Sequence, residues 1–196
     1  IGQRDGGDCD SCQGKGEKEK VNLTAPSSKI DDLVELLEEL GDEQLVVAAV
    51  SKQLINLAAA RLEKETISYG LVTGDQDMME RDSAVSAFQS GRKRVILLTL
   101  GTGAEGLTLT AASKLLFMQE SWRVLENDQM AARIDRIGSE KHTSIQIIKQ
   151  ITPGTVEESK IEVLQGKTGR IEEILRDKDV LNRLIKNEGK KLNAYS

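Results

Sequence analysis

Aromatic residues make up only 3% of the 196-residue sequence. Leu, Ile, Val and Ala must therefore build the hydrophobic core, which a chain of this length can bury without help from disulfides or metal ions. Apolar runs long enough to span a membrane are missing, and no signal-peptide pattern follows the first residues. The sequence begins Ile1-Gly2-Gln3 instead of with Met. We therefore expect a fragment of a longer protein, with no membrane partner.

An excess of basic residues is also missing. The sequence holds 27 Lys and Arg against 32 Asp and Glu, which gives a net charge of -5 and an isoelectric point near 5.2. Domains that bind nucleic acid through bulk charge are usually basic. The composition therefore argues against an autonomous nucleic-acid binder, although it allows a local basic surface that works beside another domain.

Residues that ligate metal ions are few. The only cysteines, Cys9 and Cys12, are spaced as C-x-x-C, and the only histidine is His142. A structural zinc ion needs four ligands. The cysteines are therefore either half of a site completed by other sequence or two free thiols in a reducing compartment. We favour free thiols and expect no metal site.

Three regions follow from the distribution of apolar residues. Residues 1–26 begin with an almost wholly polar stretch, and we expect a flexible, disordered linker there because such segments bury too little apolar surface to offset chain entropy. Residues 27–152 alternate short apolar runs with helical patterns. Residues 153–196 are charged and helical in pattern, and we expect a helical extension that packs on the central domain.

The central region has the pattern of a parallel α/β domain. Predicted helices begin near Ser28, Ser51 and Asp77, and another spans 126–137. The predicted strands are 45–50, 67–72, 94–98, 115–118 and 145–151. Such alternation is typical of βαβ units with right-handed crossovers. We predict a RecA-like three-layer parallel sheet flanked by helices, followed by the helical extension.

Two arginines stand out in the last of these helices. Arg133 and Arg136 are three residues apart, and Gln129 precedes Arg133 by one turn. Two guanidiniums fixed on one face bind phosphate oxygens well, and phosphoryl transfer needs such charge. The alternative is surface arginines paired with Glu126 or Asp135, which usually contribute little. From the spacing alone, this alternative is favoured.

The segment 99–110 is rich in glycine and threonine and follows a predicted buried strand. Its glycines let backbone N–H groups approach a ligand, and its threonines add hydroxyl donors. The segment is therefore either a loop that grips a nucleic-acid backbone and couples it to nucleotide or a tight turn that needs positive φ. A separate stretch, Gly166-Lys167-Thr168, looks like the end of a phosphate-binding loop, but Ile161 stands where that motif needs glycine. We therefore reject it.

Taken in chain order, these segments resemble the C-terminal lobe of the SWI/SNF-like family of superfamily-two DNA-dependent ATPases. The resemblance covers about residues 27–187. It rests on the following segments: Ser28–Leu33, Thr73–Gln89, Leu97–Ala112, Trp122–Gly138 and Gly154–Glu158. Each segment is moderately specific, and the ordered set is highly specific.

The resemblance implies the C-terminal motor lobe of an ATP-dependent DNA translocase. ATP and Mg²⁺ would be held mainly by an N-terminal RecA-like lobe of the same polypeptide, so the fragment alone is expected to be inactive. Arg133 and Arg136 would be catalytic arginine fingers. Residues expected at nucleotide are Gln129, Gly103, Glu105 and Gly106, and those expected at double-stranded DNA are Thr73, Gly74, Thr99, Thr102, Thr108 and Trp122.

Some alternatives stay open beside this interpretation. Trp122 is equally expected as a partly buried structural residue. The chain as a whole has two rivals, an RNA helicase lobe and a degenerate module that only binds proteins. An RNA helicase usually has His-Arg-x-Gly-Arg where this chain has Asp135 to Ser139, and the two retained arginines argue against a degenerate module. The expected location is intracellular: cytoplasmic in a bacterium or virus, nuclear in a eukaryote.

Overall fold

The computed structural model describes residues 3–4, 7–8, 26–103 and 106–176. Near the N-terminus, β1 (Gln3–Arg4) and β2 (Gly7–Asp8) form a short antiparallel pair. The expected linker over 1–26 lies almost wholly outside the described residues, as do both cysteines.

The main sheet has five parallel strands in the order β4-β5-β3-β6-β7. Their bounds lie within two residues of those predicted: β3 (Leu45–Ala49), β4 (Tyr69–Val72), β5 (Val95–Thr99), β6 (Lys114–Gln119) and β7 (Gln146–Lys149). Because all five strands are parallel, their carboxyl ends share one edge of the sheet and their amino ends share the opposite edge. We call these the carboxyl edge and the amino edge.

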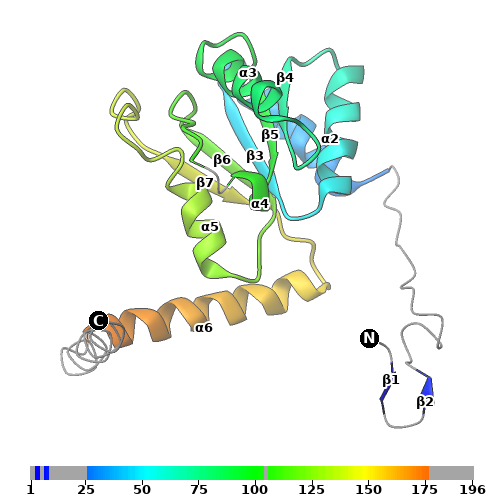
Figure 1. Cartoon of the computed structure of the whole chain (residues 1–196), viewed down its shortest axis with the longest axis vertical. Helices are drawn as coiled ribbons and strands as arrows, with labels where there is room; N and C mark the ends of the chain where they lie inside the picture. The colour runs from blue at the N-terminus through cyan, green and yellow to red at the C-terminus, as the bar shows by residue number, and fades with distance from the viewer. Residues whose placement is uncertain (1–2, 5–6, 9–25, 104–105, 177–196) are drawn as a thin grey trace, which may run out of the picture.

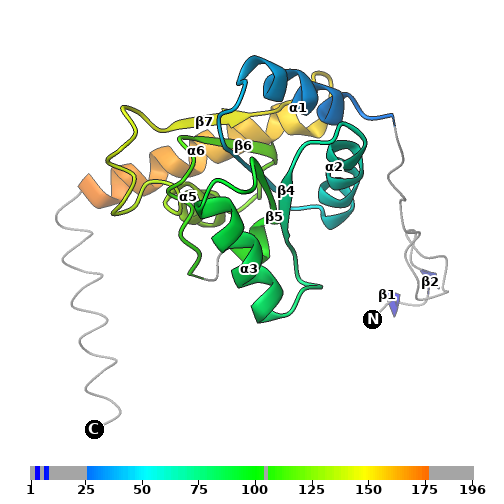
Figure 2. The same ribbon diagram turned by 90° about the horizontal axis from the view of Figure 1, so that it is seen from above.

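Helices cover both faces of the sheet. α1 (Ser28–Glu39) and α2 (Lys52–Lys64) pack on one face, whereas α3 (Met78–Gln89) and α5 (Val124–Ala131) pack on the other. Figure 2 shows the two pairs on opposite sides of the strands. This is the RecA-like three-layer α/β fold that the sequence predicts, so the predicted fold class is confirmed.

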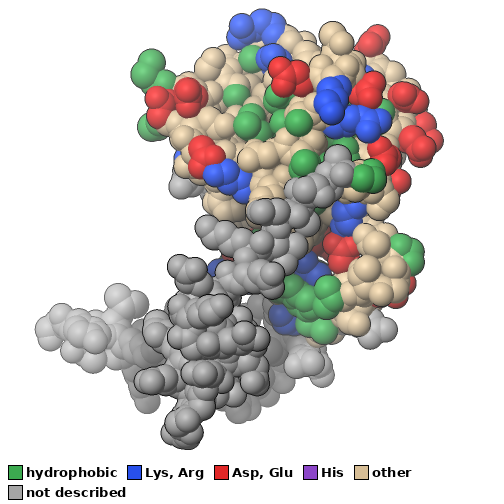
Figure 3. Space-filling view, turned by 90° about the vertical axis from the view of Figure 1, so that its right-hand side faces the viewer, with side chains coloured by type: hydrophobic (Ala, Val, Ile, Leu, Met, Phe, Trp, Pro, Cys, Tyr) green, Lys and Arg blue, Asp and Glu red, His purple; other side chains and the backbone are tan. Residues whose placement is uncertain are grey.

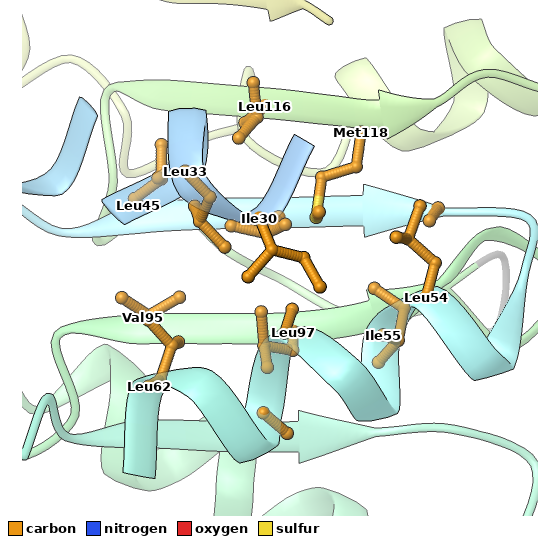
Figure 4. Close-up of a cluster of buried hydrophobic side chains, with 14 of the residues drawn as sticks. Ile30, Leu33, Leu45, Leu54, Ile55, Leu62, Val95, Leu97, Leu116 and Met118 are labelled. Carbon is orange, nitrogen blue, oxygen red and sulfur yellow. The ribbon is translucent and has the colours of Figure 1, made fainter. Parts of the chain in front are cut away.

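The two faces of β3 belong to two separate cores. Leu45, Val47 and Ala49 face the core beneath α1 and α2, and Figure 4 shows side chains of both helices meeting the sheet there. Val46 and Ala48 face the core beneath α3 and α5. All five side chains are fully buried. A strand covered on both faces needs apolar residues at every position, which explains the continuous apolar run.

Among the elements outside α5, two differ from the predicted ones. The glycine-rich segment opens with a helical turn, α4 (Leu100–Gly103), which was not predicted. The C-terminal extension is one helix, α6 (Val156–Arg176), where two pieces were predicted at 156–164 and 171–175. The predicted helix at 180–185 lies outside the described residues. Figure 1 shows α6 running beneath the sheet and past α5.

Candidate functional site

α5 ends at Ala131, five residues after Glu126, so the predicted helix over 126–137 is wrong beyond that point. The backbone first tightens, because the N–H groups of Arg133 and Ile134 donate to carbonyl oxygens only three residues back. The carbonyl oxygen of Arg133 then accepts the N–H of Leu109 (3.0 Å). Arg133 and Arg136 therefore lie in the irregular segment after α5, whereas Gln129 lies on the helix with an exposed side chain.

The Arg136 guanidinium is exposed and lies against the glycine- and threonine-rich segment. Its Nη1 is 3.4 Å from the carbonyl oxygen of Leu107 and 3.4 Å from the Thr108 hydroxyl. An open surface pocket is lined by Thr108, Asp135, Arg136, Ile137, Ser139 and Glu140. The Ile137 side chain is 95% exposed beside it. Two segments almost thirty residues apart in the sequence thus meet around one cationic side chain, while Arg133 is half-buried.

Gly138 lets the connection between α5 and β7 (132–145), which we call the arginine segment, pass close to Thr110. Its φ of +105° is one that L side chains rarely adopt. A Cβ at this position would lie 3.5 Å from the Thr110 hydroxyl oxygen. The N–H of Ser139 donates to the carbonyl oxygen of Arg136 (2.9 Å), which closes the turn after the arginine.

The remaining residues of the glycine-rich segment have mixed placements. Thr99 and Thr102 share a hydrogen bond between their hydroxyl oxygens (2.9 Å). Gly103 ends α4, and Glu105 lies outside the described residues. Gly106 is exposed and has a φ of +66°, which is the positive φ that the tight-turn interpretation of this segment requires.

Thr73 and Gly74 follow the carboxyl end of β4. The Thr73 side chain is 1% exposed, and its hydroxyl donates to Gln76 Oε1 (3.0 Å), as does its backbone N–H (2.6 Å). The Thr73 hydroxyl therefore holds the turn together. Gly74 is exposed, with nothing within 4 Å of where a Cβ would stand, so the backbone of this turn is the part open to a ligand.

Trp122 lies beyond the carboxyl end of β6, next to α6. The indole is 46% exposed, and Lys160 Nζ lies 5.2 Å from the ring centroid. Lys160 also donates to the carbonyl oxygen of Glu120, and Lys167 donates to that of Trp122 (3.0 Å). Burial lowers the pKa of the Lys160 ammonium, although the nearby Glu120 carboxylate opposes this. Both interpretations of Trp122 keep support, since the ring is half-covered.

Polar side chains fix the turn between β6 and α5. Asn127 Oδ1 accepts the N–H of Ser121 (2.8 Å), and its Nδ2 donates to the carbonyl oxygen of Ser121 (3.0 Å). The Glu126 carboxylate accepts the Ser121 hydroxyl (2.6 Å) and pairs with Arg123 (3.0 Å). The pKa of Glu126 lies below its usual value, mainly because the Ser121 hydroxyl donates a hydrogen bond and to a smaller extent because Arg123 is nearby. Sequence reasoning missed this arrangement, because its short-range polar residues resemble those of many loops.

The structure thus sorts the expected residues into two groups. The first group lies at the carboxyl edge, where Thr99 ends β5 and the others follow strands: Thr73, Gly74, Thr99, Thr102 and Trp122. Thr108, also expected at DNA, lies beside Arg136 in the connections that lead toward the amino ends of β6 and β7. Among the described residues, no group of three His, Cys, Asp or Glu side chains is placed to hold a metal ion, and no helix is long and apolar enough to cross a membrane.

Residues 28–138 match the model of the helicase conserved C-terminal domain. The chain belongs to this family. The match runs from α1 to Gly138 and therefore includes the sheet up to β6, the glycine-rich segment and both arginines.

Curated relatives place the chain more closely within the family. It is 34% identical to the DNA excision repair protein ERCC-6-like of Bos taurus over 140 residues. This match covers 69% of this chain and 11% of that protein. It is 28% identical over 185 residues to the putative ATP-dependent helicase/translocase YwqA of Bacillus subtilis, covering 92% of this chain and 20% of that protein. The chain therefore spans at most about a fifth of these two relatives.

A solved structure shares the fold. It is the C-terminal part of the Fun30 ATPase domain, with a TM-score of 0.65, 20% sequence identity, and coverage of 70% of this chain and 45% of that one. This likeness shows the fold alone, while the family match and the curated relatives bear out the predicted C-terminal helicase lobe of the SWI/SNF-like type.

Proposed function

We propose that this lobe belongs to an ATP-dependent translocase that acts on double-stranded DNA. An N-terminal RecA-like lobe of the same polypeptide holds ATP and Mg²⁺, and Arg136, with Arg133, completes the phosphate site when the two lobes close. The protein works inside the cell, wherever its DNA lies. The relatives' printed names, which include DNA repair and ATP-dependent translocation, support this proposal.

The placement of Arg136 carries the proposal. Its guanidinium is exposed in an open pocket, and the Leu107 carbonyl oxygen and the Thr108 hydroxyl hold one of its nitrogens. A planar guanidinium fixed on one side keeps its other donors for phosphate oxygens. Positive charge delivered to the γ-phosphate stabilises the transition state of phosphoryl transfer. Among the described residues, no group of three His, Cys, Asp or Glu side chains is placed to hold a metal ion, so this proposal assigns Mg²⁺ to the other lobe.

The carboxyl edge supplies the DNA contacts in this proposal. Exposed backbone at Gly74 and the half-exposed Trp122 ring lie at this edge, where N–H groups and an aromatic surface suit phosphate and sugar. On the face seen in Figure 3, Lys and Arg side chains lie among Asp and Glu side chains. The DNA contacts are therefore few and local, in keeping with the net charge of -5.

The test is ATP hydrolysis by the two-lobed protein that carries this chain. Turnover is measured alone, with duplex DNA and with duplex RNA of the same length. We expect duplex DNA to stimulate kcat and RNA to have little effect. Stimulation by RNA alone would favour the RNA helicase alternative, and no turnover with either would favour a module that only binds proteins. The 196-residue chain by itself is expected to show no turnover.

A further inference from the structure

The Gln89 side chain joins the end of α3 to the glycine-rich segment. Gln89 is the last residue of α3 and is half-buried. Its Nε2 donates to the Thr110 hydroxyl (3.3 Å), and its Oε1 accepts the N–H of Ala111 (2.8 Å). One amide group thus binds two consecutive residues, which fixes both the position and the direction of the backbone there.

His142 binds the same residue from the arginine segment. Its Nε2 is 2.9 Å from the carbonyl oxygen of Thr110. A carbonyl oxygen can only accept, so this ring nitrogen carries a proton. Thr110 is 7% exposed, and Gly138 passes close to its hydroxyl. Thr110 is therefore held between Gln89 on one side and the segment that contains Arg136 on the other.

The opposite end of α3 is tied to the turn at the carboxyl edge. Asp77 and Glu80 form a reciprocal capping box at the first turn of the helix. Gln76, directly before the cap, accepts both the N–H and the hydroxyl of Thr73. A helix of 12 residues spans about 18 Å. α3 thus connects the Thr73–Gly74 turn at one edge of the sheet with Thr110 at the other.

We propose that Gln89 and His142 are positioning residues. They hold Thr110 so that the arginine segment keeps a fixed place relative to the Thr73–Gly74 turn, which faces DNA in the proposed function. This inference rests on the proposed function, because it assigns the two side chains to the coupling of DNA contact with ATP hydrolysis. Neither side chain touches the nucleotide or the DNA in this scheme. Each acts through Thr110 and its chain neighbours, since the N–H of Leu109 donates to Arg133 and the Thr108 hydroxyl accepts from Arg136.

Two pairs of variants test the assignment in the two-lobed protein. Gln89→Met keeps the length of the side chain but removes both hydrogen bonds to Thr110 and Ala111. Its control is Gln44→Met, because Gln44 also makes two hydrogen bonds near the end of α3, to the carbonyl oxygens of Phe88 (2.6 Å) and Lys93 (2.9 Å), without touching Thr110. His142→Leu removes the N–H donor, and His142→Gln replaces it with an amide donor.

We expect Gln89→Met and His142→Leu to lower DNA-stimulated kcat by roughly 10- to 100-fold, the scale of a small misplacement of a catalytic group. KM for ATP and the affinity for DNA should stay at the wild-type values. Gln44→Met should lower the melting temperature about as much as Gln89→Met does, yet keep the wild-type kcat. His142→Gln should recover most of the kcat that His142→Leu loses. Melting curves of all four variants confirm that each is folded.

Three outcomes separate the hypotheses. If Gln44→Met lowers kcat as much as Gln89→Met at equal stability, the effect is general destabilisation and the positioning role is wrong. If Gln89→Met and His142→Leu keep wild-type kcat while Arg136→Ala loses it, the proposed function stands and only the positioning role fails. If Arg136→Ala also keeps wild-type kcat, the proposed function fails, and the positioning role fails with it.

Discussion

The N–H of Leu109 donates a 3.0 Å hydrogen bond to the carbonyl oxygen of Arg133. In a continuing helix, that carbonyl oxygen would accept the N–H of residue 137. The contact therefore replaces helix with a link between two segments that are 24 residues apart in the sequence. It places Arg136 over Leu107 and Thr108, and it makes the position of this arginine a property of the tertiary structure.

Arg136→Ala in the two-lobed protein should remove most DNA-stimulated ATP hydrolysis and leave ATP binding nearly intact. An arginine finger acts mainly in the transition state, so its loss appears in kcat rather than in nucleotide affinity. Such residues contribute roughly 10³- to 10⁵-fold in rate, far more than a surface ion pair. Steady-state turnover at saturating DNA, together with a nucleotide titration, measures both quantities.

Arg136→Lys gives the matched comparison. A lysine keeps the charge but lacks the planar fork, so we expect it to recover little activity. Melting curves check that both variants fold. The finger assignment is wrong if the folded alanine variant keeps more than about a tenth of wild-type kcat, since that loss is no more than about 1.4 kcal/mol.

Gly138→Ala should destabilise the chain by about 1–3 kcal/mol, because a Cβ at a φ of +105° is strained. Gly166→Ala is the contrasting change. Gly166 lies inside α6 without a positive φ, and nothing lies within 4 Å of the place where its Cβ would stand. Alanine there should stabilise the helix by up to about 1 kcal/mol. Chemical unfolding of the three proteins measures the differences, and equal stabilities would contradict the role of Gly138.

Glu157→Gln should destabilise the chain at neutral pH and much less in acid. Burial tends to raise the pKa of Glu157, but hydrogen bonds from Lys29 (2.5 Å) and the N–H of Thr152 (2.9 Å) outweigh it, so the pKa lies below its ordinary value. A carboxylate whose pKa is lowered by folding stabilises the fold above its unfolded pKa, and this contribution is lost as the pH falls through the folded pKa.

Unfolding free energies at neutral pH and below about pH 4, near the unfolded pKa of a glutamate, check this expectation. The free energy of unfolding of the wild type should exceed that of Glu157→Gln by about 1.5–3 kcal/mol at neutral pH, the range for hydrogen bonds to a charged group, and the gap should close in acid. Glu158→Gln changes the neighbouring exposed carboxylate and should show little difference at either pH. A gap that is independent of pH would show that the ion pair with Lys29 does not tie α1 to α6.

The 196-residue chain alone should bind duplex DNA weakly, with an affinity that falls as salt rises. Each phosphate contact releases counterions, so the logarithm of the binding constant falls with the logarithm of the salt concentration by about 0.9 for each contact. Fluorescence anisotropy over a salt series measures the slope. Submicromolar binding at physiological salt would contradict the expectation, because few contacts are available on a surface of mixed charge.

The sequence by itself determined the layers of this fold. Continuous apolar runs such as Leu45 to Ala49 predict strands buried on both faces, and helical periodicity predicts the helices that cover them. These signals are local, because each depends on the side chains within one element. The ordered motifs of the sequence also indicate the SWI/SNF-like family, and the family match agrees.

Only the tertiary structure decided where the candidate site lies. Spacing placed Gln129, Arg133 and Arg136 on one helix, but α5 ends at Ala131, and the carbonyl oxygen of Arg133 accepts from Leu109 instead of continuing the helix. Gln89 ended one of the segments that carry the family resemblance, but nothing in the sequence indicated that it and His142 both bind Thr110. The physical reason is that these positions depend on contacts between segments far apart in the sequence, and local periodicity does not contain those contacts.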